Sequence, residues 1–267
     1  MRAGASGIPE PIGSWLCIDT GEHDGRFNMD YDLRLVENYK SNRVPILRFY
    51  TWKPFCISLG KNQNESDIDR ERAASDGIDV VKRPTGGKAV LHAEELTYSV
   101  VMETGGRSVR ETYNAISAAL ASGLRRLGAD LELSRSSADF RKLFHDPSAI
   151  PCFSTSAVYE VESGGRKIIG SAQHRFGDVL LQHGSILVGD FHKRIVDYLK
   201  IDENLRRKTR EDLDNHTVAL AHLISGNIES ENLKSALKSG FEEVFRIRVS
   251  DLPAAELISH RLTLAAS

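Results

Sequence analysis

Three cysteines are the side chains of this sequence best suited to covalent chemistry. Cys17 and Cys56 lie inside the apolar runs WLCIDT and PFCISLG, where a cysteine usually acts as a small buried hydrophobic residue. Cys152 follows a proline after a polar stretch, and loops are the places where functional side chains concentrate. Of the three, Cys152 is therefore the one placed to meet a substrate.

The cysteine spacing also limits what else these residues do. The count is odd, the spacings are wide, and no CxxC pair or cysteine–histidine set with zinc spacing occurs. We therefore predict neither disulfides nor a metal site, and no cofactor.

A second group with chemical potential is Lys-Arg-Pro-Thr-Gly-Gly-Lys at 82–88, which interrupts two apolar runs. A Walker A phosphate loop would need glycine five residues before Gly87 and Ser or Thr after Lys88, but Lys82 and Ala89 stand there. Two readings stay open: an ordinary connection between strands, or paired glycines that let an extended ligand approach the main chain.

Composition excludes several classes of protein. The chain has 35 Lys and Arg against 37 Asp and Glu, so it has no overall field to attract nucleic acid or an anionic membrane. No apolar run of about 18 residues occurs, and residues 1–14 do not resemble a signal peptide. With 267 residues, 40% of them hydrophobic, the chain can build a sizeable core. We expect a cytoplasmic protein that binds neither nucleic acid nor membrane.

The elements that must position these residues are mostly strands in the middle of the chain. Neighbouring strands are joined by short turns, which predicts an α+β fold. We expect one domain over 1–267, with a loose arm at 1–13, a mobile loop over a site at 134–150, and closing helices over 190–267. Expected strands are 15–20, 44–52, 55–60, 78–83, 88–92, 96–102 and 178–189, with 78–102 forming successive strands of one sheet and a hairpin over 157–173. Expected helices are 28–40 with Asn28 as its cap and Met29, Leu33 and Val36 as its apolar positions, 66–77, and 108–128.

The segment from Lys82 to His92, followed by Leu-Thr-Tyr-Ser at 96–99, resembles the RRxTGGxAVxHxxxLxxS signature of the lipoate-protein ligase and octanoyltransferase family. The resemblance extends over about 15–188 and includes NMDYDLRL, PILRFYTWKPFCISLGKNQ and GRKIIGSAQHRFGDVLLQHGSILV. It implies a mixed sheet flanked by helices, as in the catalytic domain of biotin- and lipoate-protein ligases, and a tunnel for an eight-carbon acyl chain beside the glycines. It further implies substrate-binding roles for Arg83, Thr85, Gly86, Gly87, Lys88, His92, Gly170, Ser171, Ala172, His183 and Gly184. Lys82 departs from the arginine that the family often has there, and we assign it no contact.

Two chemistries occur in that family. Ligases activate free lipoate with ATP and typically carry Asn-Asp before the strand that leads to the GRK hairpin, whereas one type of octanoyltransferase has Cys-Phe there, ahead of Tyr-Glu. This chain has Cys152-Phe153 and then Tyr159-Glu160, which resembles the transferase. The resemblance implies transfer of octanoyl from acyl carrier protein to a lysine of a lipoyl domain or glycine-cleavage H protein through a thioester on Cys152. The alternatives are an ATP-dependent lipoate-protein ligase and a non-catalytic acyl- or lipoyl-binding protein.

A thiol suits this reaction because exchange between thioesters is nearly isoenergetic and leaves a product that reacts with amines. The Lys167 ammonium is the candidate for lowering the pKa of that thiol. By resemblance, Lys167 also holds the acyl carbonyl, and it could relay a proton. A structural role for His183 is about as plausible as a role in the site. The basic residues Arg206, Arg207, Lys208 and Arg210 are either a docking surface for an acidic carrier protein or a solvated face.

Overall fold

The computed structural model describes residues 13–134 and 160–253. Residues 1–12 of the predicted N-terminal arm, almost all of the predicted mobile loop, and Cys152 lie outside the described residues, as do residues 254–267.

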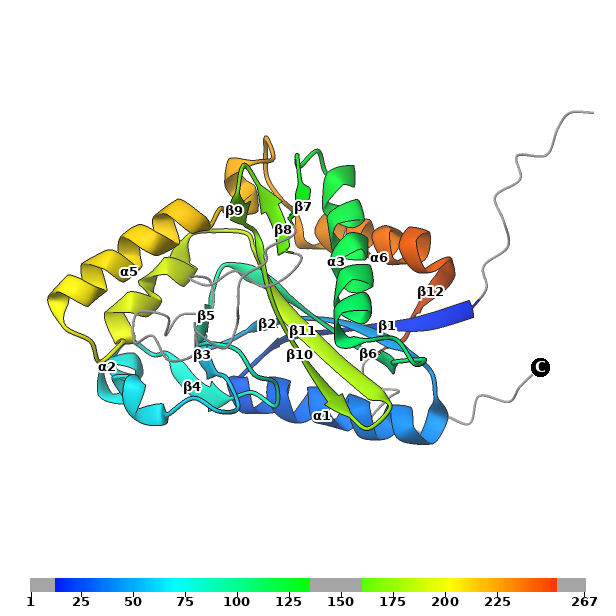
Figure 1. Ribbon diagram of the computed structural model, residues 1–267, viewed down its shortest axis with the longest axis horizontal. Coiled ribbons are helices and arrows are strands. Elements are labelled where there is room, and N and C mark those ends of the chain that lie inside the picture. Colours follow the sequence, from blue (N-terminus) through cyan, green and yellow to red (C-terminus); the bar gives the residue numbers. More distant parts are fainter. Residues whose placement is uncertain (1–12, 135–159, 254–267) are drawn as a thin grey trace, which may run out of the picture.

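A mixed sheet with the strand order β10-β11-β6-β2-β1-β12 forms the centre of the described fold (Figure 1). β1 pairs in parallel with β2 and β12, and the pairs β2–β6, β6–β11 and β10–β11 are antiparallel. The two faces of the sheet bury alternate side chains, as Cys17 and Ile18 of β1 illustrate by belonging to different core clusters. The bounds are β1 Gly13–His23, β2 Ile46–Trp52, β6 Glu95–Glu103, β10 Ile169–Phe176, β11 Val179–Leu187 and β12 Ile247–Asp251.

Helices cover both faces of this sheet (Figure 1). α3 (Val109–Arg126) and α6 (Ser230–Phe245) pack against each other in the core cluster that contains Cys17, whereas α1 (Gly25–Asn42) contributes to the cluster that contains Ile18. The α+β architecture predicted from the sequence is therefore present.

A smaller sheet with the order β4-β3-β5 stands beside the large one. It comprises β3 Cys56–Leu59, β4 Asp79–Lys82 and β5 Val90–His92, and its core includes residues of α2 (Arg70–Ser75), α5 (Glu203–His216) and the 3-10 helix η4 (Phe191–Tyr198). The prediction that 78–102 forms strands of a single sheet is wrong, because β4 and β5 pair with β3 while β6 pairs with β2 and β11. The chain changes sheets between His92 and Glu95, so the glycine turn of 83–89 belongs to the smaller sheet.

A third, short sheet carries the predicted hairpin. β8 (Glu160–Ser163) turns through Gly164 and Gly165 into β9 (Arg166–Lys167), and β7 (Glu132–Ser134) pairs with the other edge of β8. Both glycines have positive φ, 55° and 73°, a conformation that suits glycine in a tight hairpin turn. The hairpin is thus confirmed for the part of it that the structure describes.

The first helix begins earlier than the sequence suggested. Asp24 caps it by accepting a hydrogen bond from the Phe27 amide at 2.7 Å, so Asn28 lies inside the helix and not at its cap. Leu33 is 38% exposed, whereas Met29 and Val36 are buried as expected. The buried face instead repeats at Asn28, Asp32, Leu35 and Tyr39, which places a carboxylate in the core.

The long helix predicted for 108–128 is confirmed as α3. Ser108 and Glu111 form a reciprocal capping box at its start, in which each side chain bonds to the backbone amide of the other residue. No described helix is long and apolar enough to cross a membrane.

The region from 190 onward contains the predicted helices, but it also ends in a strand. This region also contains the 3-10 helix η5 (Leu220–His222). A further 3-10 helix, η1 (Glu65–Asp67), precedes α2. β12 extends the large sheet in parallel beside β1, and Val249 is buried within it. The expectation of closing helices alone was wrong because the short run Ile-Arg-Val follows α6 with a period of two rather than 3.6.

His192 of η4 gives the fold a measurable pH dependence. Burial lowers the pKa of its imidazole from 6.5 to about 4, and Nε2 lies 3.0 Å from Thr217 Oγ1. Below pH 6.5 the His192 imidazole is protonated in the unfolded chain, whereas in the folded protein it stays neutral until about pH 4. The free energy of unfolding therefore falls as the pH is lowered from 6.5 to about 4. We expect His192→Gln to remove about 2 kcal/mol of the difference in unfolding free energy between pH 7 and pH 5, measured by urea titration. An unchanged difference in the variant would contradict this.

Candidate active site

The glycine turn that joins β4 to β5 is held by Arg83. Its guanidinium donates to the carbonyl oxygens of Gly86 and Lys88, at 2.9 and 2.6 Å from Nη2, and to that of Ser58 at 2.8 Å from Nη1. Three acceptors around one planar, permanently charged donor fix the turn from inside. Arg83 is therefore built into the turn and is not a mobile surface arginine.

The two glycines of the turn are needed for different reasons. Gly87 has φ of 93°, and a side chain there would also meet the Arg83 guanidinium. Gly60, at the end of β3, packs directly on the Gly87 carbonyl, so a Cβ at position 60 would overlap that oxygen. A Cβ on Gly86 would meet no atom of residues 13–134 and 160–253 within 4 Å. The backbone at Gly86 consequently has open space beside it.

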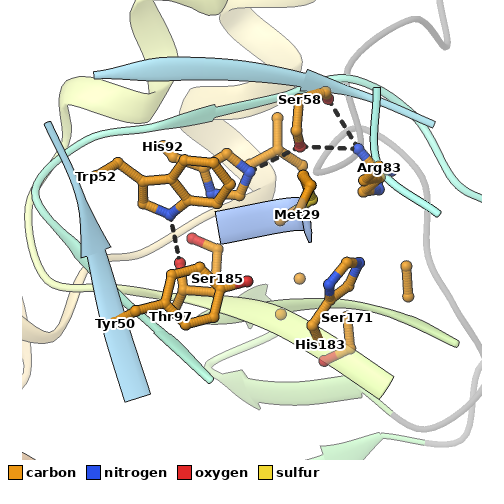
Figure 2. Close-up of a pocket in the computed structure, with 14 residues that line it drawn as sticks. Met29, Tyr50, Trp52, Ser58, Arg83, His92, Thr97, Ser171, His183 and Ser185 are labelled. Atoms are coloured by element: carbon orange, nitrogen blue, oxygen red, sulfur yellow. Dashed lines mark hydrogen bonds between the residues drawn. The ribbon is translucent and has the colours of Figure 1, made fainter. Parts of the chain in front are cut away.

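A pocket lies beside this turn, between the smaller sheet and the β10–β11 pair (Figure 2). Its empty volume is about 340 Å³, which includes space open to solvent. The pocket is lined by Met29, Tyr50, Trp52, Ser58, Arg83, Val90, His92, Thr97, Gly170, Ser171, Ala172, His183, Gly184 and Ser185.

Most of the residues predicted to bind substrate meet at this pocket. Those that line it are Arg83, His92, Gly170, Ser171, Ala172, His183 and Gly184. Thr85, Gly86, Gly87 and Lys88 lie in the adjoining turn, and Thr85 reaches the pocket by its 2.7 Å hydrogen bond with His183 Nε2. The structure brings these two signatures of the sequence together from segments about 90 residues apart.

The approach of β10 to β11 and β6 depends on a glycine. A Cβ at Gly184 would lie 2.6 Å from the Gly170 carbonyl oxygen and 2.8 Å from Cε1 of Tyr98, closer than real side chains come. Gly184 thus has a packing role beside the pocket, which sequence reasoning assigned only to substrate.

Asp32 is a site residue that sequence reasoning missed. Its carboxylate is fully buried and accepts hydrogen bonds from Arg48 at 2.8 Å, Ser99 at 2.8 Å and Tyr50 at 3.1 Å, and His183 Nδ1 lies 2.8 Å away. With Nδ1 donating to Asp32, a neutral His183 accepts the Thr85 hydroxyl proton at Nε2. The carboxylate of α1 is in this way connected through β11 to the glycine turn.

Burial and neighbouring charges determine the protonation states of Asp32 and His183. Burial alone would raise the pKa of Asp32, but the Arg48 guanidinium and the hydrogen bonds from His183 and Ser99 outweigh it and hold the pKa below its ordinary value. Burial lowers the pKa of His183, despite the nearby Asp32 carboxylate. An ionised Asp32 beside a neutral His183 is the arrangement that follows.

Glu95 was also missed. Its carboxylate accepts from the Thr97 and Ser185 hydroxyls and lies 2.8 Å from His92 Nδ1. The other nitrogen of His92 is 2.7 Å from the Ser58 hydroxyl, and the ring stacks on Trp52 with centroids 4.1 Å apart (Figure 2). The available signal was a carboxylate at the start of a strand that is buried along almost its whole length.

Lys167 lies at the end of β9 and not among the residues that line the pocket. Its Nζ forms an ion pair of 2.6 Å with Glu160 of β8, and the two side chains are only 6% and 3% exposed. Lys167 is therefore a buried residue and not a solvated lysine on the strand surface. Its proximity to Cys152 stays a prediction, because Cys152 lies outside the described residues.

Cys17 and Cys56 are core residues, as predicted. Both are buried, and burial raises the pKa of Cys17 to about 12 and that of Cys56 well above its ordinary value. Thiols held in this way are poor nucleophiles at neutral pH. Within the described ranges, no group of three or more His, Cys, Asp or Glu could hold a metal ion.

The basic cluster on α5 divides into two parts. Arg206 donates to the Val196 carbonyl, and Arg210 pairs with Asp197 at 2.7 Å, so both attach α5 to η4. Arg207 and Lys208 are exposed. Half of the cluster therefore has a structural role, and a docking role stays a prediction for the other half.

Gly60 and Gly86 offer a matched pair of variants for the turn. We expect Gly60→Ala to destabilise the protein by about 1–3 kcal/mol, because the new methyl group must displace the Gly87 carbonyl. Gly86→Ala should leave the unfolding free energy within about 0.5 kcal/mol of wild type. Chemical denaturation of both variants measures this. Equal stability of the two would contradict the contact between β3 and the turn.

Comparison with known protein families identifies the class to which this chain belongs. Residues 24–242 match the lipoyl protein ligase A/B catalytic domain, and the chain belongs to that family. The predicted family and fold are thereby confirmed.

Curated relatives match about 90% of the chain. It is 36% identical to octanoyltransferase LipM of Kyrpidia tusciae over 91% of this chain and 92% of the relative. It is 34% identical to octanoyltransferase LipM of Bacillus subtilis, covering 88% of each. Among solved structures, the bipartite lipoate protein ligase of Thermoplasma acidophilum superposes with a TM-score of 0.75 at 22% identity, over 92% of this chain and 89% of that chain. The last similarity concerns the fold alone, while the first two confirm the predicted class, an enzyme related to octanoyltransferases.

Proposed function

We propose that the protein transfers an octanoyl group from acyl carrier protein to a lysine of a lipoyl domain or the glycine-cleavage H protein. The observation that carries the proposal is the similarity to octanoyltransferases over about 90% of the chain. Cys152-Phe153 followed by Tyr159-Glu160 supports the same reaction, because that pattern distinguishes the transferase from the ligase.

The reaction proceeds in two exchanges at one thiol. The Cys152 thiolate attacks the thioester carbonyl of the octanoyl donor, and the donor's thiolate leaves and takes up a proton. The acceptor's lysine amine then attacks the new thioester on Cys152, the Cys152 thiolate leaves, and the amine loses a proton as the amide forms. The donor thioester is already activated, so the reaction consumes no ATP.

The pocket and the turn supply the binding part of this reaction. A chain that enters the pocket meets Met29, Val90 and the rings of Tyr50 and Trp52. The open space beside Gly86 allows the acyl group to approach the backbone. This placement supports substrate-binding roles for the turn and for Gly170, Ser171 and Ala172.

Lys167 is the proposed general acid–base residue. Its ion pair with Glu160 keeps a buried ammonium compensated. A positive charge in this position would favour the Cys152 thiolate and later the developing charge on the acyl carbonyl. The cytoplasmic location expected from the sequence stays a prediction.

Incubating the protein with octanoyl-acyl carrier protein, without ATP, and recording its intact mass tests the proposal. We expect one octanoyl adduct, lost on treatment with hydroxylamine and on addition of a lipoyl domain, which gains it. Modification of the lipoyl domain only when ATP and free octanoate or lipoate are present would establish the ligase instead. Acyl binding without turnover in either assay would establish a binding protein.

A further inference from the structure

The pocket presents an apparent conflict, because many of its lining side chains carry polar groups although the proposed ligand is a plain alkyl chain. Ser58, Thr97, Ser185, His92 and His183 all line it. Exposed donors on the wall would be left unsatisfied by a bound alkyl chain, at a cost for each group. Whether the donor hydrogens of the wall point into the pocket or away from it therefore determines which acyl chains the pocket binds.

Glu95 collects the donors on one side of the pocket. Its carboxylate is 2% exposed, and its two oxygens lie within bonding distance of the Thr97 hydroxyl, the Ser185 hydroxyl and His92 Nδ1. A carboxylate only accepts, so all three hydrogens point toward Glu95. They consequently point away from the space that a ligand would occupy.

The arrangement continues one bond further from Glu95. With Nδ1 of His92 donating to Glu95, Nε2 carries a lone pair and accepts the Ser58 hydroxyl proton at 2.7 Å. The Trp52 indole donates to Thr97 Oγ1 at 2.7 Å (Figure 2). Directly or through one further bond, the Glu95 carboxylate thus orients five donor groups of the wall away from the pocket and toward the protein interior.

Asp32 acts in the same way on two further groups, because the Tyr50 hydroxyl and His183 Nδ1 donate to it. The Arg83 guanidinium donates to Ser58 and to the turn carbonyls. Among the lining side chains, Ser171 is the one whose hydroxyl hydrogen is not assigned by its partner, because it shares a 2.7 Å bond with the Tyr98 hydroxyl.

We infer that Glu95 is a specificity-determining residue, which makes a polar-lined pocket accept an unsubstituted acyl chain and reject a hydroxylated one. The choice of an octanoyl chain rests on the proposed function. A hydroxyl on the chain would find most donors of the wall already engaged, three of them by Glu95, so its oxygen would lose hydrogen bonds that it accepts from water. A pocket of this kind discriminates by about 10–100-fold.

Glu95→Gln tests this with little change of shape. The glutamine amide offers one accepting oxygen and two donor hydrogens, so the three donors that Glu95 accepts can no longer all be satisfied. At least one is released toward the pocket. The quantity to compare is the ratio of the affinity for 8-hydroxyoctanoate to the affinity for octanoate. We expect this ratio to be about tenfold higher in Glu95→Gln than in wild type.

The measurement is isothermal titration of octanoate and of 8-hydroxyoctanoate into wild type, Glu95→Gln and Glu103→Gln. Glu103 ends the same strand with its side chain exposed, so its variant makes the same chemical change outside the pocket and should retain the wild-type ratio. An unchanged ratio in Glu95→Gln overturns the inference. So does a wild-type protein that binds both acids equally.

A measurement on wild type keeps the inference testable if the variant does not fold. Long-range ¹H–¹⁵N spectra of the imidazole nitrogens should show His92 protonated at Nδ1 and unprotonated at Nε2. The opposite tautomer would overturn the inference. The titration and the transfer assay are also independent: a shifted ratio without octanoyl transfer would leave the inference standing and reject the proposed function, and transfer with an unshifted ratio would do the reverse.

Discussion

Replacing Lys167 with alanine is expected to slow octanoyl transfer by about 10²–10⁴-fold, the usual range for a positioned acid–base group. The structure adds a reason that the sequence did not contain. Lys167 and Glu160 form a buried ion pair of 2.6 Å, so the carboxylate compensates an ammonium that is largely shielded from water. The charge proposed to stabilise the Cys152 thiolate is therefore maintained by Glu160.

Glu160→Gln should reproduce part of the loss. Without its counter-charge, a buried ammonium favours the neutral amine, because burial disfavours the charged form. The thiol should then become less acidic, as it does in Lys167→Ala. Lys167→Arg should retain thiolate formation better than transfer to the amine, because arginine keeps its charge but does not readily release a proton.

Iodoacetamide alkylation of Cys152 against pH measures the thiol in all four proteins, and mass spectrometry identifies the modified residue. Cys152→Ala should form no acyl adduct. Arg166→Ala removes an exposed charge next to Lys167 and should match wild type. Alkylation profiles that coincide for wild type and Lys167→Ala, together with an acyl adduct on Cys152→Ala, would leave no role for the pair.

The sequence allowed the local elements of the site to be predicted, because each depends on neighbouring residues. The glycine turn, the Gly164-Gly165 hairpin and the amphipathic α3 are of this kind. The division of 78–102 between two sheets was not predictable in the same way, because β5 and β6 are both buried strands and their partners β3 and β2 distinguish them. Periodicity shows that a strand is buried without showing what it pairs with.

The two buried carboxylates were missed for a related reason. Asp32 occupies the buried stripe of α1 with Leu35 and Tyr39, but a polar residue in a helix is ordinarily read as solvent-exposed. Its cation, Arg48, comes from β2 and its histidine from β11. A charge can be assigned to a core only when its partners are known, and here they are 16 and 151 residues away.

Removing the Asp32 carboxylate is expected to cost about 3–5 kcal/mol of unfolding free energy, the range for breaking a buried ion pair by deleting one partner. Asp32 and Arg48 are both 0% exposed, and Arg48 also stacks 3.8 Å from the centroid of the Tyr50 ring. In Asp32→Ala the guanidinium would stay buried without its carboxylate, and the Ser99 and Tyr50 hydroxyls would lose their acceptor. Urea denaturation at pH 7 measures the loss.

Asp30→Ala on the same helix is the matched control. Its carboxylate is exposed and 3.7 Å from Arg26, so its removal should change stability by less than about 1 kcal/mol. The contribution of Asp32 to the unfolding free energy should also persist on mild acidification. The pKa of its carboxyl is held below 3.8, and the contribution is lost only as the pH falls through that lowered pKa. If Asp32→Ala unfolds no more easily than Asp30→Ala, the buried pair does not stabilise the fold, and the connection from α1 through His183 to the glycine turn loses its anchor.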